Sequence, residues 1–281
     1  MGVQLGDGSQ VAGWLTPSRR LELYSPTMVD FGWPEYATPG YIESHVRASD
    51  IDIAEGELVL MPTFRLPTMI HTRSGNAKYL NEISNTHPLW MNTVDAERLG
   101  FSTGDLARVS TEIGHFVARV WSTEAIRPGV IGLSHHMGRW RNSENAGSRW
   151  VMGLVDVGRL PDGRWRLRYK DLVKPFDSDD PDSSRITWDD PGVHQNLAFG
   201  VHPDPWSGMH CWHQKVHVEH AHSDDQYGDV VVDTAKSTEV FREWLAKTRP
   251  GPSASGMRRP EFMMRPVKPV RRAFYTSSPP E

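Results

Sequence analysis

Residues 86–136 read THPLWMNTVDAERLGFSTGDLARVSTEIGHFVARVWSTEAIRPGVIGLSHH. This stretch predicts a short helix over 94–99, because Asn92 or Thr93 can cap its first turn and Gly100 can end it with a positive φ. Runs of apolar and β-branched residues predict strands around it, at 88–91, 106–110, 115–122 and 130–133. A strand, a short helix and three further strands joined by tight turns are typical of a small closed β-barrel with a helical insert.

The small and acidic residues of this stretch are regularly spaced. They follow the pattern N-x-x-D-A-x-x-L-G-x-x-x-G-D over residues 92–105, and Ile126-x-Pro128-Gly129-Val130 follows later. This pattern resembles the C-terminal cofactor-binding domain of the molybdopterin oxidoreductases, the dimethyl-sulfoxide-reductase superfamily. The resemblance extends over residues 16–222 and is strongest at 86–136. It implies a six-stranded double-psi β-barrel that holds a molybdopterin guanine dinucleotide.

Length, charge and cysteine count exclude several classes of protein. The chain has 281 residues and a formal net charge of −4, so nothing indicates a nucleic-acid surface. No apolar run approaches the roughly 18 residues of a membrane span, and the N-terminus lacks a secretory pattern. We therefore expect a cytoplasmic location and no direct membrane span. A single cysteine, Cys211, excludes an internal disulfide and a four-cysteine iron–sulfur cluster on this chain.

The sequence predicts three segments, at 1–50, 51–235 and 236–281. The first resembles the family's lead-in from a catalytic body, which we expect to be missing from this chain. The second is the barrel, with an insertion at 142–192 that contains the hairpin signal Leu160-Pro161-Asp162-Gly163. Aspartates crowd the end of this insertion, but their spacing is not that of a calcium loop, so we interpret them as a solvated acidic loop.

The third segment is predicted to begin with a helix over 237–247, capped by Ser237 or Thr238. The remaining tail, 249–281, is rich in proline and carries seven basic residues against two acidic ones. Such a composition predicts an extended C-terminal arm, which either wraps a partner subunit or forms a floppy end.

The segment before a predicted helix at 77–83 is a candidate anion site. An arginine just before a helix N-terminus, with its free backbone donors, suits a phosphate group. The resemblance implies that this segment approaches the pterin and its pyrophosphate. The candidate cofactor contacts here are Thr72, Arg73, Ser74 and Asn76. The alternative is an ordinary polar loop with a helix cap.

Two later segments also resemble cofactor contacts of the family. His135 and His136 directly follow the last strand of the opening stretch, where relatives place such contacts. The alternative is a surface loop with adventitious histidines. Asn196 and, with less support, His213 and Lys215 match the family's closing segment, in which a final strand completes the dinucleotide pocket.

The histidine-rich end of the chain allows another interpretation. Five histidines lie close together, at 210, 213, 217, 220 and 222. They lack the H-E-x-x-H helix motif and scatter over both faces of a strand, so an independent zinc site is disfavoured. Cys211 is not expected to bind molybdenum, because the family's metal-ligating side chain lies in the missing upstream part. We predict no catalytic residue and no metal ligand on this chain.

The resemblance implies the cofactor-binding portion or subunit of a molybdenum or tungsten bis-molybdopterin guanine dinucleotide oxidoreductase. Its partners would be a catalytic body on another chain and an iron–sulfur electron-transfer subunit. The closing residues 204–208, DPWSG, and the tail resemble enzymes acting on the sulfur oxyanions sulfite and thiosulfate or on polysulfide. We expect no turnover by this chain alone. The alternatives are a standalone dinucleotide-binding or scaffold module and a metal hydrolase; an aspartic protease is excluded because no Asp-Thr/Ser-Gly triplet occurs.

Overall fold

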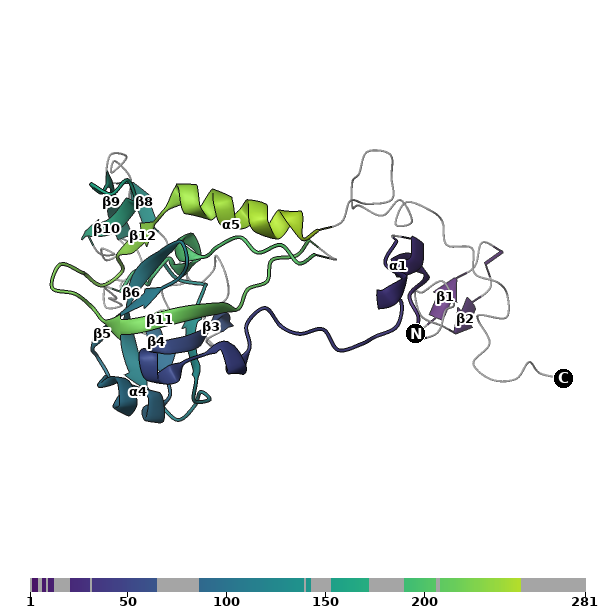
Figure 1. Cartoon of the computed structure of the whole chain (residues 1–281), viewed down its shortest axis with the longest axis horizontal. Coiled ribbons are helices and arrows are strands. Elements are labelled where there is room, and N and C mark those ends of the chain that lie inside the picture. Colours follow the sequence, from purple (N-terminus) through teal and green to yellow (C-terminus); the bar gives the residue numbers. More distant parts are fainter. Residues whose placement is uncertain are drawn as a thin grey trace, which may run out of the picture. The chain divides into compact units, whose positions relative to one another are not determined.

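The computed structural model of this chain describes ten stretches of residues (Figure 1). These are 2–4, 7–8, 10–12, 21–30, 32–64, 86–138, 140–142, 153–171, 190–205 and 208–248. The chain divides into two compact units. One contains residues 1–43 and 249–281, and the other, the barrel unit, contains Ser44–Thr248. The segment boundaries predicted at residues 50 and 235 stay predictions.

The smaller unit contains little regular structure among its described residues. Strand β1 (Gly2–Gln4) pairs antiparallel with β2 (Gln10–Ala12). A short helix, α1 (Pro26–Asp30), and a 3-10 turn, η1 (Pro34–Tyr36), follow. The extended arm predicted over 249–281 lies outside the described residues.

Six strands close into the predicted β-barrel. They are β3 (Glu57–Phe64), β4 (Pro88–Met91), β5 (Leu106–Ser110), β6 (Gly114–Ser122), β7 (Val130–Ser134) and β11 (Gln214–His220). Their order is β4-β7-β3-β11-β5-β6, and a pairing between β4 and β6 closes the ring. The pairs β3–β7 and β4–β6 are parallel and the other four are antiparallel. The predicted mainly-β fold and six-stranded barrel are therefore confirmed.

Alternation along each strand builds the barrel core. Every second side chain points inward, and most of the inward residues are apolar and at most 2% exposed, whereas Gln214 is polar and 3% exposed. They include Leu58, Leu60, Leu89, Met91, Ala107, Val109, Ala118, Val120, Ile131, Leu133, Val216 and Val218. Because a fully buried leucine or valine contributes about 1.5–3 kcal/mol, this set supplies most of the free energy that holds the barrel together.

The short helix α4 (Thr93–Leu99) forms as predicted and starts one residue earlier. The side chain of Asn92 accepts a hydrogen bond from the Val94 amide at 2.9 Å and donates to the Ile126 carbonyl at 2.7 Å. Gly100 ends the helix with a φ of 77°. Asn92 therefore both caps α4 and ties it to the turn before β7.

A second group of strands extends the sheet beyond the barrel. It consists of β8 (Trp140–Asn142), β9 (Gly153–Arg159), β10 (Trp165–Asp171) and β12 (Val230–Val232). Strand β6 joins the two parts, because its first residues pair with β12 and its last residues pair with β4. The β9–β10 hairpin confirms the predicted hairpin insertion, and in Figure 1 it lies at the end of the barrel unit opposite α4.

Helix α5 (Thr234–Ala246) corrects the predicted start at residue 237. Its N-cap is Asp233, whose carboxylate accepts from the amides of Ala235 and Lys236 at 2.9 Å each. Neither Ser237 nor Thr238 is the cap, because β12 ends at Val232, directly before Asp233, and leaves no intervening loop. Short 3-10 turns occupy Ala48–Asp50 (η2), Ile53–Glu55 (η3) and Gln195–Ala198 (η5). Among the helices described, none is both long and apolar enough to cross a membrane.

A partly buried ion pair attaches the inserted hairpin to the loop before β12. Arg168 of β10 donates from Nε and Nη2 to the Asp229 carboxylate, and from Nη2 to the Asp224 carbonyl at 2.6 Å. Asp229 is only 1% exposed and also accepts from the Gln226 amide at 3.1 Å. Removing one member of such a pair leaves the other charge without its partner.

We therefore expect Asp229→Ala to lower the free energy of unfolding by about 3 kcal/mol. The control is Asp162→Ala, which breaks an exposed pair with Arg164 in the hairpin turn and should produce no measurable change. Urea denaturation of the three proteins checks this expectation. Equal stabilities of the two variants would contradict the assigned role of Asp229.

Candidate functional site

Two parallel strand ends meet at one edge of the barrel. Strands β3 and β7 are parallel neighbours, so their C-terminal ends lie side by side. Thr63 and Phe64 both pair with Ser134, which places a β-bulge at this edge. The chain leaves β3 here toward the segment predicted to contact the pyrophosphate. That segment, with Thr72, Arg73, Ser74 and Asn76, lies outside the described residues.

The loop after β7 packs tightly against the segment that returns from the insertion. Gly138 has a φ of +84°, and a Cβ there would lie 2.3 Å from the nitrogen of His194 and from the carbonyl carbon of Val193. Its amide donates to the Pro191 carbonyl at 2.9 Å. We call residues 134–138 the β7 loop and 190–196 the return segment, and the two together the rim.

The structure places His135 and His136 within the rim. His135 is partly buried, and its Nδ1 donates to the Pro62 carbonyl at 3.1 Å. Its ring stacks on Trp212 with centroids 6.2 Å apart. His136 is 3% exposed, with its ring 4.2 Å from that of His135. A surface loop with adventitious histidines therefore does not describe His136.

His87 bridges the two halves of the rim. Its Nδ1 accepts from the Val193 amide at 2.9 Å, which leaves the proton on Nε2. Nε2 then donates to the Ser134 carbonyl at 2.5 Å. The ring is completely buried, and this burial lowers the pKa of His87 to about 4 despite the opposing effect of the Asp190 charge. His87 is thus a neutral imidazole at physiological pH.

Asp190 fixes the start of the return segment. One carboxylate oxygen accepts from the His87 amide and from the Thr86 hydroxyl, both at 2.9 Å. The other accepts from the Gly192 amide at 2.8 Å and from the Tyr227 hydroxyl at 2.5 Å. Burial and the neighbouring Asp190 charge raise the pKa of Tyr227 well above its usual value, so the phenol remains a donor.

The positions of Asp190 and His87 correct the interpretation made from the sequence. Asp190 was assigned with its neighbours to a solvated acidic loop, whereas four donors surround its carboxylate. His87 was not among the predicted site residues. The signals that mark them are local: a histidine precedes Pro88 at a strand start, and an aspartate precedes a Pro-Gly turn at 191–192.

Gln195 and Asn196 complete the rim. Gln195 is 1% exposed, and its Nε2 donates to the carbonyls of Leu133 at 2.7 Å and Pro62 at 3.3 Å. It therefore ties η5 to the ends of both parallel strands. The side-chain oxygen of Asn196 is buried and has no hydrogen-bond partner among the described residues. Asn196 thus offers an acceptor that remains available within the rim.

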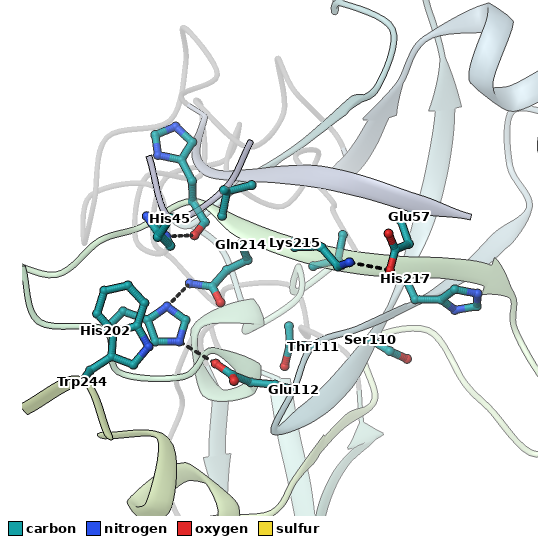
Figure 2. A pocket seen from close by; sticks show the side chains of 13 residues that line it. His45, Glu57, Ser110, Thr111, Glu112, His202, Gln214, Lys215, His217 and Trp244 are labelled. Atoms are coloured by element: carbon teal, nitrogen blue, oxygen red, sulfur yellow. Dashed lines mark hydrogen bonds and ion pairs between the residues drawn. The ribbon is translucent and has the colours of Figure 1, made fainter. Parts of the chain in front are cut away.

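The structure separates His213 and Lys215 from the other predicted contacts. They line a cleft of about 460 Å³ on the outer side of β11, whose lining includes neither rim histidine nor Asn196 (Figure 2). The Lys215 ammonium pairs with Glu57 at 2.6 Å and donates to the Asp50 carbonyl at 3.1 Å. Strand alternation explains why Lys215 points out of the barrel, because exposed and buried residues alternate at the start of β11.

The polar groups of this cleft mostly satisfy one another. His202 stacks flat on Trp244 with centroids 4.4 Å apart, and its Nε2 donates to Glu112 at 2.5 Å (Figure 2). This bond lowers the pKa of the Glu112 carboxyl. Gln214 donates to the other ring nitrogen of His202 at 3.4 Å. The arrangement fastens α5 to the barrel and leaves this His–Glu pair engaged rather than available to a substrate.

Metal ligation and thiolate chemistry receive no support from the described part of the chain. Within it, no group of three or more His, Cys, Asp or Glu side chains could hold a metal ion. Burial, followed by the Asp204 charge, raises the pKa of the Cys211 thiol, which disfavours a thiolate.

A family comparison decides what this barrel is. Residues 48–150 match the family described as "Molydopterin dinucleotide binding domain". This stretch is a molybdopterin dinucleotide-binding domain of the dimethyl sulfoxide reductase family. The match includes strands β3 to β7, helix α4 and the β7 loop.

Curated proteins are similar to part of this chain. The chain is 28% identical over 133 residues to dimethyl sulfoxide reductase DmsA of Haemophilus influenzae, which covers 44% of this chain and 16% of that protein. It is 30% identical over 141 residues to DmsA of Escherichia coli, which again covers 44% of this chain and 16% of that protein. Dopamine dehydroxylase of Eggerthella lenta is 26% identical over 156 residues, or 54% of this chain and 15% of the relative. The matched part thus spans about one sixth of each relative.

Among solved structures, acetylene hydratase from Pelobacter acetylenicus is similar, with 18% identity and a TM-score of 0.46. The similarity covers 78% of this chain and 25% of that structure.

The rim residues fit the chemistry of a molybdopterin dinucleotide. Pterin and guanine rings present N–H donors on their edges, and Asn196 offers a buried oxygen that can accept from them. The partly buried His135 ring, which already stacks on Trp212, is the kind of flat surface against which a planar heterocycle packs. The domain implies a cofactor of the molybdenum bis-molybdopterin guanine dinucleotide type.

Proposed function

We propose that this chain is the cofactor-binding portion or subunit of a molybdenum or tungsten bis-molybdopterin guanine dinucleotide oxidoreductase. The observation that carries this proposal is the dinucleotide-binding domain at residues 48–150, with the buried acceptor of Asn196 at the barrel edge where β3 and β7 end. When bound, the cofactor supplies the redox and oxo-transfer chemistry. The chain supplies binding, orientation and protection from water.

Within this proposal each predicted residue has a defined task. Asn196 accepts a hydrogen bond from a ring edge, and the rim histidines form the wall beside it. Arg73 pairs with the phosphates, with its three polar neighbours at 72, 74 and 76 as further donors. His213 and Lys215 are the weaker candidates, because they line the outer cleft and Lys215 is already paired with Glu57.

We further propose that the catalytic body and an iron–sulfur electron-transfer subunit reside on partner chains. The curated proteins similar to part of this chain are about six times longer than the matched part, which supports a larger assembly. The alternative is a module that binds the dinucleotide or scaffolds a complex without turnover. The two differ in whether a partner accompanies the cofactor.

Affinity purification of the full chain from its own host tests the proposal. We expect a large partner chain and stoichiometric molybdenum or tungsten. Acid hydrolysis should release guanosine monophosphate from the bound dinucleotide. Cofactor without a partner would favour the standalone module. A chain that elutes without metal or nucleotide would contradict the proposal, and one zinc per chain would favour a hydrolase.

Asn196→Ala should lower the guanosine monophosphate recovered per chain at least about tenfold, because the dinucleotide loses a buried acceptor. The matched control is Asn92→Ala, which removes another buried asparagine, the cap of α4. We expect this control to lower the free energy of unfolding by about 1 kcal/mol and to leave nucleotide recovery unchanged. Equal recovery from wild type and Asn196→Ala would contradict the assigned contact.

For the substrate we propose a sulfur oxyanion, sulfite or thiosulfate, or the related sulfur anion polysulfide. The support is the resemblance of residues 204–208, DPWSG, to enzymes of that group. The purified complex should turn over at least one of these compounds faster than dimethyl sulfoxide. The reverse order would contradict this substrate class and leave the cofactor proposal intact.

A further inference from the structure

One buried side chain holds both halves of the rim. His87 contacts the β7 loop at the Ser134 carbonyl and the return segment at the Val193 amide. We infer that His87 is a positioning residue for the dinucleotide, because its imidazole fixes the two rim segments in register with each other. This inference rests on the proposed function, since the rim is the proposed binding surface.

The two hydrogen bonds have opposite polarity, and only the neutral ring can make both. The Val193 amide is a donor and needs an acceptor at Nδ1, while the Ser134 carbonyl is an acceptor and needs a proton at Nε2. The ring nitrogens stand at fixed positions on a rigid plane. Once His87 is placed, the separation and orientation of the two backbone groups are therefore set.

The backbone of His87 is itself held in place. Its amide donates to Asp190, and the same carboxylate accepts from the Gly192 amide in the return segment. The Tyr169 hydroxyl donates to the Gly192 carbonyl at 2.9 Å. Both polar groups of the Gly192 peptide backbone are thus bonded, so His87 works against a fixed support rather than a loose chain.

Close packing transmits the position of His87 to the residues proposed to contact the cofactor. A Cβ on Gly192 would lie 3.0 Å from Nδ1 of His87 and 2.7 Å from the Gly138 amide, so these backbones leave no room for adjustment. Further along the return segment, Gln195 bonds back to the Leu133 carbonyl. Val193 and Gln195 are thus both tied to the β7 side of the rim, and loss of the His87 bond removes one of the two ties that position Asn196.

The test uses the full 281-residue chain with graded substitutions. His87→Leu removes both hydrogen bonds, His87→Gln retains a donor toward Ser134, and His87→Asn retains an acceptor toward Val193. The matched control is His115→Leu. His115 is buried like His87, with 7% of its surface exposed. It lies in β6 between Ser110 and Val231 rather than in the rim.

Two readouts are measured for each variant. Amide hydrogen exchange of the free chain reports the order of the rim, and guanosine monophosphate recovered from the host-purified complex reports dinucleotide binding. We expect His87→Leu to speed exchange over 134–138 and 190–196 about tenfold and to lower recovery about tenfold. The glutamine and asparagine variants should give values between those of wild type and His87→Leu. His115→Leu should change neither readout.

The outcomes separate this inference from the proposed function. Unchanged exchange in the rim of His87→Leu would overturn the inference. Faster exchange with normal nucleotide recovery would also overturn it, because His87 would then be structural only. A wild-type complex that yields no guanosine monophosphate, whatever the exchange pattern, would overturn the proposed function and with it this inference.

Discussion

Gly138→Ala is expected to lower the free energy of unfolding by about 3 kcal/mol or more, the largest loss we expect from a single added methyl group. Two physical terms combine at this position. A φ of +84° is strained for any residue with a Cβ. The new Cβ would also lie 2.3 Å from backbone atoms of Val193 and His194, which cannot rotate away as a side chain could.

Gly104 provides the matched control for Gly138→Ala. Its φ is +103°, but a Cβ there would meet nothing within 4 Å. Gly104→Ala should therefore show the conformational term alone, about 1 kcal/mol. Urea denaturation of the two variants and wild type measures the difference. Equal losses would show that the β7 loop and the return segment do not approach as closely as the structure has them.

The barrel could be predicted from sequence because its signals are local. Alternating apolar residues mark the strands, and Asn92 and Gly100 mark both ends of α4 within one turn of the helix. The start of α5 was missed for the opposite reason, because its signal is not local. The three valines 230–232 form a strand whose pairing partners, β6 and β10, are distant in sequence, so the cap at Asp233 was not recognised.

The bridging role of His87 could not be read from the sequence. Its partners Ser134 and Val193 are 47 and 106 residues away, and only the closed barrel brings them to one ring. Asp190 was misread because its neighbours in sequence are acidic, which suggests solvation. Its partners in space are donors from three separate segments of the chain.

The candidate cofactor contacts taken from the family resemblance fall into two groups, those whose position suits a contact and those whose position suits it less. Asn196 lies on the rim with a buried acceptor, as a contact requires. Lys215 fits less well, because the antiparallel pairing of β11 with β3 brings Glu57 within reach of its ammonium. Strand alternation predicts that Lys215 points outward, but the identity of the neighbouring strand follows only from the topology.

Acidification is expected to destabilise the domain through His87. In the folded chain, burial lowers its pKa to about 4, whereas an unfolded histidine titrates near 6.5. Between these values the unfolded chain binds a proton that the folded chain excludes, so stability falls as the pH decreases. The contribution is fully present above pH 6.5 and is lost toward pH 4, a change of about 3 kcal/mol.

His87→Gln isolates this effect from the general loss of carboxylate interactions in acid. Glutamine keeps a donor toward the Ser134 carbonyl and does not titrate, so the variant should be less stable than wild type at pH 7 but nearly equal to it at pH 4. Urea denaturation at pH 7, 6, 5 and 4 gives both curves. Parallel curves would mean that His87 takes up its proton without unfolding.

His115 offers an independent check on the same reasoning. Burial, assisted by the Arg108 charge, lowers its pKa to about 4 as well, so His115→Gln should flatten the pH dependence in the same direction. Among the described residues the two histidines share no partner, and their effects should therefore add in the double variant. The two histidines differ in their effect on the rim. Acid should loosen residues 134–138 and 190–196 in the wild type and in His115→Gln, because only His87 loses its bond to Val193 when its ring is protonated.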